Sequence, residues 1–97
     1  MSEQKRIEIK VQADPAAQEG VYSNFAKITH TADEVTLDFL YINFDPPFGR
    51  LRARVILSPS HAKRFLGALG DNLQKYEASF GPIAPPMQPP PDLGLIQ

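Results

Sequence analysis

Apolar and polar residues alternate along four stretches of the chain, which is the pattern of strands with one buried face. The four stretches are residues 6–13, 21–30, 35–44 and 50–57. The first (RIEIKVQA) is the clearest, because Ile7, Ile9 and Val11 lie on one side and charged residues on the other. The short connections between the stretches carry Asp, Gly and Pro, which favour turns, and they span residues 14–20, 31–34 and 45–49. We therefore expect a four-stranded, mostly antiparallel meander.

The pattern becomes helical after Leu57. Ser58 followed by Pro59 is a favourable helix start, because serine caps the N-terminus and proline suits the first turn. Apolar residues then recur at three- and four-residue steps, so they fall on one stripe of the helix. The stripe comprises Ala62, Phe65, Leu66, Leu69, Leu73, Tyr76 and Phe80. Gly81-Pro82 should end the helix. Four strands followed by one amphipathic helix packed on the sheet (ββββα) predict an α+β domain over residues 1–81.

Residues 82–97 form a proline-rich tail, which holds six of the ten prolines. So many prolines exclude a helix or a central strand, so we expect an extended or disordered segment. Leu93, Leu95 and Ile96 near its end suit a short docking peptide that adds to a sheet edge or fills a groove. An inert, solvated tail is the alternative.

One face of the predicted sheet is a candidate partner surface. The helix covers one face, and the third strand places apolar side chains on the other. In the fourth strand three arginines alternate with apolar residues, which predicts a row of guanidinium groups on one face. The predicted partner or oligomer surface comprises Leu40, Ile42, Phe44, Phe48, Arg50, Arg52 and Arg54.

The arginine row has three interpretations. The arginines pair across strands with Glu8 or Asp38 in a purely structural role, they contact a partner protein, or they bind single-stranded nucleic acid beside aromatic rings. A net charge of −1 argues against a dedicated duplex-binding domain, whose affinity comes from neutralising phosphates. Asp38 needs a partner if it is buried, and an arginine on the same face is the natural one.

The sequence shows no catalytic or metal-binding constellation, so we expect neither an enzyme nor a cofactor. The chain has no cysteine, which excludes disulfides and thiolate metal sites. His30 and His61 have no further ligands of the right kind nearby. Ser58 and Ser60 are explained as capping residues, and Asn24 is expected to mark a bulge or to bond locally to backbone. The lack of cysteine, of an apolar leader and of a membrane-length segment fits a cytoplasmic protein without a membrane partner.

Three motif segments, VYSNF (21–25), DEVTLDF (33–39) and the run from Arg52 to Gly81, resemble a small bacterial and archaeal family. The family is a domain of unknown function, number 3467. Its members share a Tyr-x-Asn segment, a Glu-x-x-x-Asp-Phe strand, an Arg-Val-x-x-Ser-Pro turn and the helix that follows. The resemblance covers about residues 20–82 and implies no activity.

The order of elements is also similar to that of two binding classes. SecB-like chaperones build a four-stranded antiparallel sheet and a helix, assemble into oligomers and bind unfolded chains. Pur-like and Whirly-like proteins share the order and bind single-stranded nucleic acid. These similarities concern architecture and do not decide function.

We therefore expect a non-enzymatic protein-binding or assembly module, with a SecB-like holdase or adaptor as its most concrete form. A core this small, without disulfides, favours a homo-oligomer. The oligomer would contact a protein or peptide through the sheet, the tail or both. The alternative is a single-stranded nucleic-acid binder that uses the arginine row.

Overall fold

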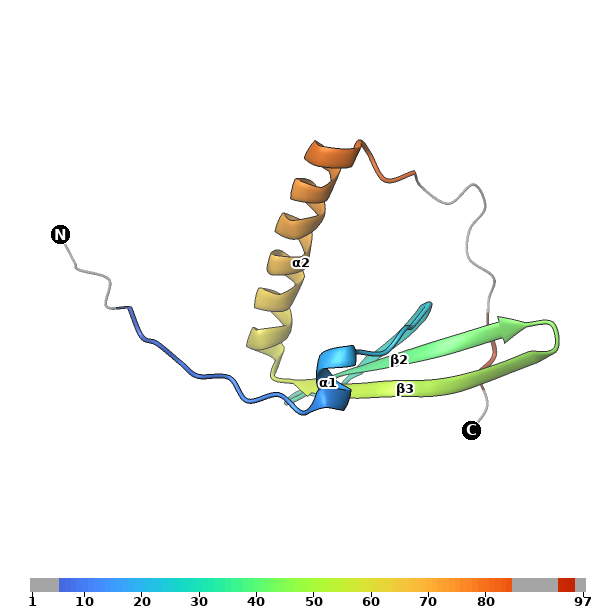
Figure 1. Cartoon of the computed structure of the whole chain (residues 1–97). Helices are drawn as coiled ribbons and strands as arrows, with labels where there is room; N and C mark the ends of the chain where they lie inside the picture. Colours follow the sequence, from blue (N-terminus) through green and yellow to red (C-terminus); the bar gives the residue numbers. More distant parts are fainter. Residues whose placement is uncertain (1–5, 85–92, 96–97) are drawn as a thin grey trace.

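A computed structural model of the 97-residue chain describes residues 6–84 and 93–95. Its elements are α1 (Pro15–Glu19), β1 (Phe25–His30), β2 (Val35–Phe44), β3 (Pro47–Leu57) and α2 (Pro59–Phe80). The strands form one antiparallel sheet in the order β1-β2-β3, and α2 follows it (Figure 1). The α+β class is confirmed, but the sheet in the described residues has three strands rather than four.

Residues 6–13, the expected first strand, are extended but pair with no strand in the described part of the chain. Figure 1 shows this segment leading away from the sheet. Its apolar side chains are open to solvent, with Ile7, Ile9 and Val11 79%, 78% and 81% exposed. The four-strand prediction is therefore wrong for the single chain. Alternation shows that a segment has one apolar side, but a strand also needs a neighbour that accepts its backbone hydrogen bonds.

Several element boundaries differ from those expected. The predicted turn over residues 14–20 contains the single-turn helix α1, which starts at Pro15, ends at Glu19 and is followed by Gly20 with a φ of 76°. β1 begins at Phe25 rather than at residue 21, and β3 begins at Pro47 rather than at Arg50. The turn between β2 and β3 is therefore shorter than predicted, and the hairpin is longer.

The start and end of α2 agree with the prediction. The Ser58 hydroxyl accepts a hydrogen bond from the His61 backbone N–H at 3.2 Å, which is the expected N-cap contact. At the other end Gly81 has a φ of 91°, and its N–H donates to the Glu77 carbonyl at 2.8 Å. Both ends depend on contacts within a few residues, which is why the local sequence predicts them.

α2 does not pack on the sheet as predicted. It leaves the end of β3 at a steep angle (Figure 1), and six large apolar residues of its stripe stay between 42% and 76% exposed. One extended residue, Ser58, separates β3 from α2, so the connection is too short to fold the helix back over the strands. Among the described residues the buried hydrophobic side chains are Leu37, Ile42 and Leu57. The described part of the single chain thus has almost no core.

A β-bulge divides β3. Phe39 pairs with Ala53, but the next residue of β2, Leu40, pairs with Leu51, which leaves Arg52 as an extra residue. The regular alternation of β3 is interrupted at this point. Odd-numbered residues before the bulge therefore lie on the same face of the sheet as even-numbered residues after it.

The bulge separates the predicted row of arginines. Residues that lie opposite each other in an antiparallel pair share a face. Along β2, the Leu37 face carries Val35, Leu37, Phe39 and Tyr41, and the Leu40 face carries Asp38, Leu40, Ile42 and Phe44. Arg54 pairs with Asp38 on the Leu40 face, whereas Arg50 pairs with Tyr41 on the Leu37 face. The prediction that all three arginines share one face is wrong, because it assumed unbroken alternation.

Candidate functional site

A hollow of about 650 Å³ opens on the Leu40 face near the turn between β2 and β3. Its apolar lining from the sheet comprises Leu40, Ile42, Phe44, Pro47, Phe48 and Leu51. Gly49 also lines it, and a Cβ placed on Gly49 would lie only 3.0 Å from the Ile42 Cδ1 atom. A larger residue at position 49 would therefore force the Ile42 Cδ1 atom to shift by a few tenths of an ångström.

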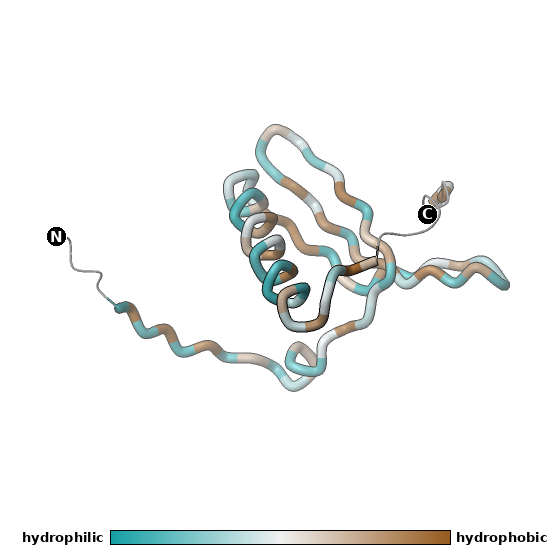
Figure 2. The backbone as a smooth tube through the Cα atoms, turned by 90° about the horizontal axis from the view of Figure 1, so that it is seen from above, coloured by the Kyte–Doolittle hydropathy of each residue, from teal (hydrophilic) through white to brown (hydrophobic). Residues whose placement is uncertain are grey.

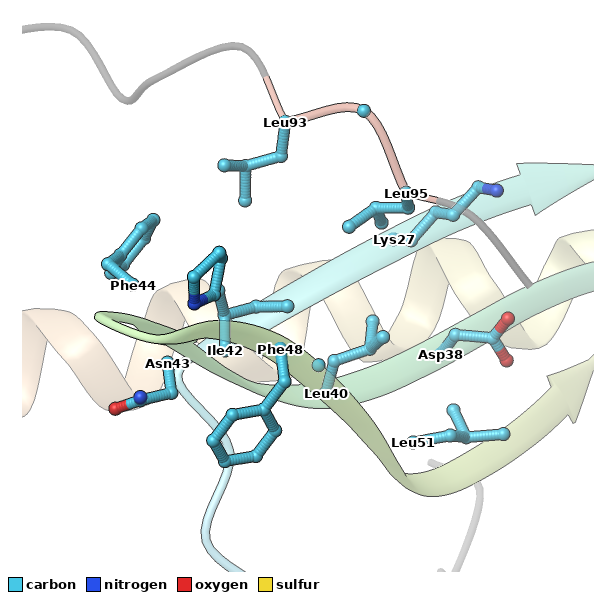
Figure 3. Close-up of a pocket in the computed structure, with 13 residues that line it drawn as sticks. Lys27, Asp38, Leu40, Ile42, Asn43, Phe44, Phe48, Leu51, Leu93 and Leu95 are labelled. Atoms are coloured by element: carbon cyan, nitrogen blue, oxygen red, sulfur yellow. The ribbon is translucent and has the colours of Figure 1, made fainter.

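Residues 93–95 of the C-terminal tail line this hollow. Leu93 and Leu95 are part of its lining, and Figure 3 shows both on the side of the sheet toward which Ile42 points. Ile96, the third residue of the predicted docking peptide, lies outside the described residues, as do residues 85–92. Two leucines separated by one glycine thus lie across an open hollow from the apolar residues of the sheet.

An ion pair flanks the hollow on the Leu40 face. The Arg54 guanidinium donates from Nε to Asp38 Oδ1 at 2.7 Å and from Nη2 to Asp38 Oδ2 at 3.0 Å. This forked geometry is the strong form of the pair. The hydrogen bonds from Arg54 hold the pKa of Asp38 below its ordinary value, although partial burial opposes the shift. Asp38 pairs with an arginine as expected, and the Arg54 charge is thereby neutralised.

The Leu37 face carries an aromatic cluster at the same end of the sheet. Tyr22, Tyr41 and Phe48 line a second hollow of about 310 Å³ together with Arg50 and Arg52. The ring centroids of Tyr22 and Tyr41 are 6.4 Å apart, and those of Tyr41 and Phe48 are also 6.4 Å apart. Three tilted rings therefore form a continuous row beside two guanidinium groups.

The predicted partner surface is thus divided between the two faces. The Leu40 face holds Leu40, Ile42, Phe44 and Arg54, and the aromatic cluster on the Leu37 face holds Arg50 and Arg52. Phe48, near the tip of the hairpin, lines both hollows. Sequence reasoning missed the contribution of Tyr22, because it lies before β1 and reaches Tyr41 only through the tertiary fold.

Asn24 fixes the chain just before β1. Its side-chain Nδ2 donates to the Ile42 carbonyl at 3.0 Å, and its Oδ1 accepts from the Ile42 N–H at 2.8 Å. Its own backbone N–H donates to the Leu40 carbonyl at 3.1 Å. The side-chain amide therefore takes the place of a strand's peptide group. The expected hydrogen bond to backbone is present, but it is not local, because Ile42 lies 18 residues away in the sequence.

The two hollows offer apolar side chains, ring faces and guanidinium groups, together with the polar side chains of Lys27, Asp38 and Asn43. Over residues 6–84 and 93–95 there is no group of three or more side chains able to hold a metal ion. In that same part of the chain, every buried side-chain nitrogen and oxygen has a hydrogen-bond partner. No helix among the described residues has the length and hydropathy needed to cross a membrane.

Comparison with known proteins assigns the family. A family model described as "Protein of unknown function (DUF3467)" matches residues 1–85. No curated protein and no solved structure matches the chain, so the similarity to SecB-like chaperones has no support from these comparisons. The match includes the extended residues 6–13 as well as the sheet and α2, and it is wider than the motif segments alone indicate. The chain belongs to this family of unknown function.

Proposed function

We propose that this protein is a non-enzymatic assembly module that works as a homo-oligomer, in which a second copy completes the hydrophobic core. The observation that carries the proposal is the exposed stripe of α2. A helix with one apolar stripe gains most of its stability in a protein by burying that stripe. In the single chain the stripe faces solvent, while three side chains make up the buried hydrophobic core of the described residues.

The exposed area supports the same proposal. The chain exposes 9387 Å², whereas a compact monomer of 10.8 kDa is expected to expose about 5,500 Å². The excess is roughly 3,900 Å² per chain, or about 7,800 Å² for two chains, and obligate interfaces bury about 2,000–5,000 Å² in total. One interface with a second copy would therefore cover a large part of the excess but not all of it. The apolar surfaces of two copies also match each other. Each chain carries an uncovered helix stripe and exposed apolar residues on the Leu37 face, such as Ile28 and Val55.

The Leu40 face supports the binding part of the proposal. Leu93 and Leu95 in the lining support a ligand of one kind, namely an extended segment with leucines at every second position. A partner with such a segment would compete with Leu93 and Leu95 for the same apolar residues. A holdase or adaptor role requires that the assembled oligomer keep this face accessible when the tail leaves it.

The mass of the full-length chain in solution tests the proposal. Size exclusion with multi-angle light scattering from about 1 to 100 µM should give a multiple of the 10.8 kDa chain mass. The unfolding midpoint should rise with protein concentration, because association stabilises the fold. A 10.8 kDa species that unfolds cooperatively, with a midpoint independent of concentration, would contradict the proposal.

A second candidate, single-stranded nucleic-acid binding, is favoured by the aromatic cluster. Rings beside arginines are the usual platform for unpaired bases, and Arg50 and Arg52 lie beside Tyr22, Tyr41 and Phe48. Fluorescence anisotropy with labelled single-stranded DNA and RNA at about 0.15 M salt tests it. Submicromolar affinity that is lost on Tyr41→Ala and Arg50→Ala would support this candidate. The assembly proposal expects weak binding or none, because the net charge is −1.

A further inference from the structure

We infer that residues 6–13 of one copy add to the free edge of β1 in a second copy, so that the sheet gains its fourth strand only in the assembly. The inference rests on the proposed homo-oligomer and names the contact that builds it. It also reconciles the alternating sequence of residues 6–13 with their lack of a partner in the single chain.

Residues 6–13 have the properties of a donor strand. Hydrophobic and hydrophilic residues alternate along this segment without interruption, and it stands clear of the rest of the chain (Figure 2). Ile7, Ile9 and Val11 form its apolar side and are almost fully exposed. Eight extended residues span about 27 Å. An extended segment with one apolar side suits addition to a sheet edge, where the backbone bonds to the edge and the side chains continue the face.

The outer edge of β1 has the properties of an acceptor. β1 pairs with β2 on one side only, so among the described residues its outward backbone groups meet no strand. A free edge of this kind is a template for pairing with another chain. On the Leu37 face, Ile28 of β1 is 63% exposed and would lie beside the apolar side chains of the added strand.

The polar side of the segment selects β1 over β3, the other edge of the sheet. An added strand that continues the Leu37 face with its apolar side must place its charged side on the Leu40 face. There β1 offers Lys27 and Thr29 beside Phe25, whereas β3 offers Leu51, Ile56 and Arg54, whose charge Asp38 already neutralises. Glu8 of the donor can lie beside Lys27, and opposite charges on neighbouring strands stabilise a sheet.

We assign the added strand to a second copy of this chain. Each chain carries one donor segment (residues 6–13) and one acceptor edge (β1), so in a dimer with a twofold axis both donors pair with both acceptors at once. The donor leads away from the sheet of its own chain (Figure 1). Closed exchange of this kind leaves no unpaired donor and no free β1 edge, which also limits further growth of the assembly.

Nuclear magnetic resonance on the full-length protein tests the inference. Isotope-labelled and unlabelled copies are mixed, unfolded and refolded together, and isotope-filtered spectra record only contacts between copies. We expect contacts between residues 6–13 of one copy and residues 25–30 of another. We also expect every second backbone amide of residues 6–13 to be protected from hydrogen exchange, because alternate amides of an edge strand point toward its neighbour.

Two single substitutions give a matched comparison in the donor segment. Ile9→Ser removes an apolar contact and should weaken assembly about tenfold or more, whereas Lys10→Ser on the polar side should change it less than about twofold. Three results in a protein that is still oligomeric would overturn this inference but not the proposed function. They are contacts of residues 6–13 within one chain only, contacts of these residues with β3, and amides of residues 6–13 that exchange freely. A monomeric protein would overturn the proposed function as well, and the scattering mass distinguishes these results.

Discussion

Replacing Leu73 with alanine tests whether the stripe of α2 is covered in the working protein. Leu73 lies in the stripe and is 42% exposed in the single chain. In a covered interface, Leu→Ala removes buried methyl groups and leaves a cavity, which costs about 2–5 kcal/mol at each site. On a helix face open to water the same change has little effect, because leucine and alanine both favour helices.

The symmetry of a homodimer increases the expected effect. Each copy contributes one Leu73, so two covered sites would cost about 4–10 kcal/mol per dimer. Leu73 is already partly covered within its own chain, so we expect the lower end of that range. At about 1.4 kcal/mol for each factor of ten, a loss of about 4 kcal/mol raises the dissociation constant roughly 1,000-fold.

Light scattering and urea unfolding at two protein concentrations measure this effect. Gln74→Ala is the control, because residue 74 is adjacent in sequence but lies about 100° around the helix, away from the stripe. We expect the Leu73→Ala protein to dissociate at concentrations where the Gln74→Ala protein keeps the wild-type mass. If the two variants share the same mass and the same urea midpoint, the stripe does not form the interface.

Three further predictions concern the sheet. Asn24→Ala should lower the free energy of unfolding by about 1–3 kcal/mol in urea titrations, because the N–H and carbonyl groups of Ile42 lose their partner; an unchanged value would contradict the structural role of this side chain. Asp38 has a pKa below 3.8 in the folded chain, so its stabilising effect is present above pH 3.8 and is lost as the pH falls through the folded pKa. Asp38→Asn should therefore flatten the acid side of the pH–stability curve, and a curve as steep as that of the wild type would refute this. Leu93→Ser combined with Leu95→Ser should leave the melting temperature nearly unchanged but increase the fluorescence of a dye that binds apolar surfaces, and unchanged dye binding would show that the tail does not cover the hollow.

Elements whose limits depend on local contacts were predictable from the sequence. β2 has the predicted bounds, and α2 begins after Ser58 and ends before Gly81 as expected. The pairing of Asp38 with an arginine also followed from a simple rule, because a carboxylate between apolar neighbours needs a cation. These features are decided within a few residues or by one pair of charges.

The remaining features depend on contacts that a local pattern does not contain. The bulge at Arg52 involves no glycine or proline to mark it, so alternation alone placed Arg50 and Arg54 together. The late start of β1 follows from a bond between Asn24 and a backbone group in another strand. The position of α2 was not predictable either, because a stripe pattern favours burial of one helix face but does not name the segment that buries it.

The bulge at Arg52 has a consequence for how this strand tolerates changes in length. Arg52 has no partner of its own, and the pairs on either side, Phe39 with Ala53 and Leu40 with Leu51, continue without it. A chain that lacks residue 52 would keep every one of these pairs and every side chain on its present face. Position 52 is therefore a place where the hairpin can gain or lose one residue locally. A relative with a strand one residue shorter should therefore align with its gap at this position, and its hairpin should superimpose from end to end.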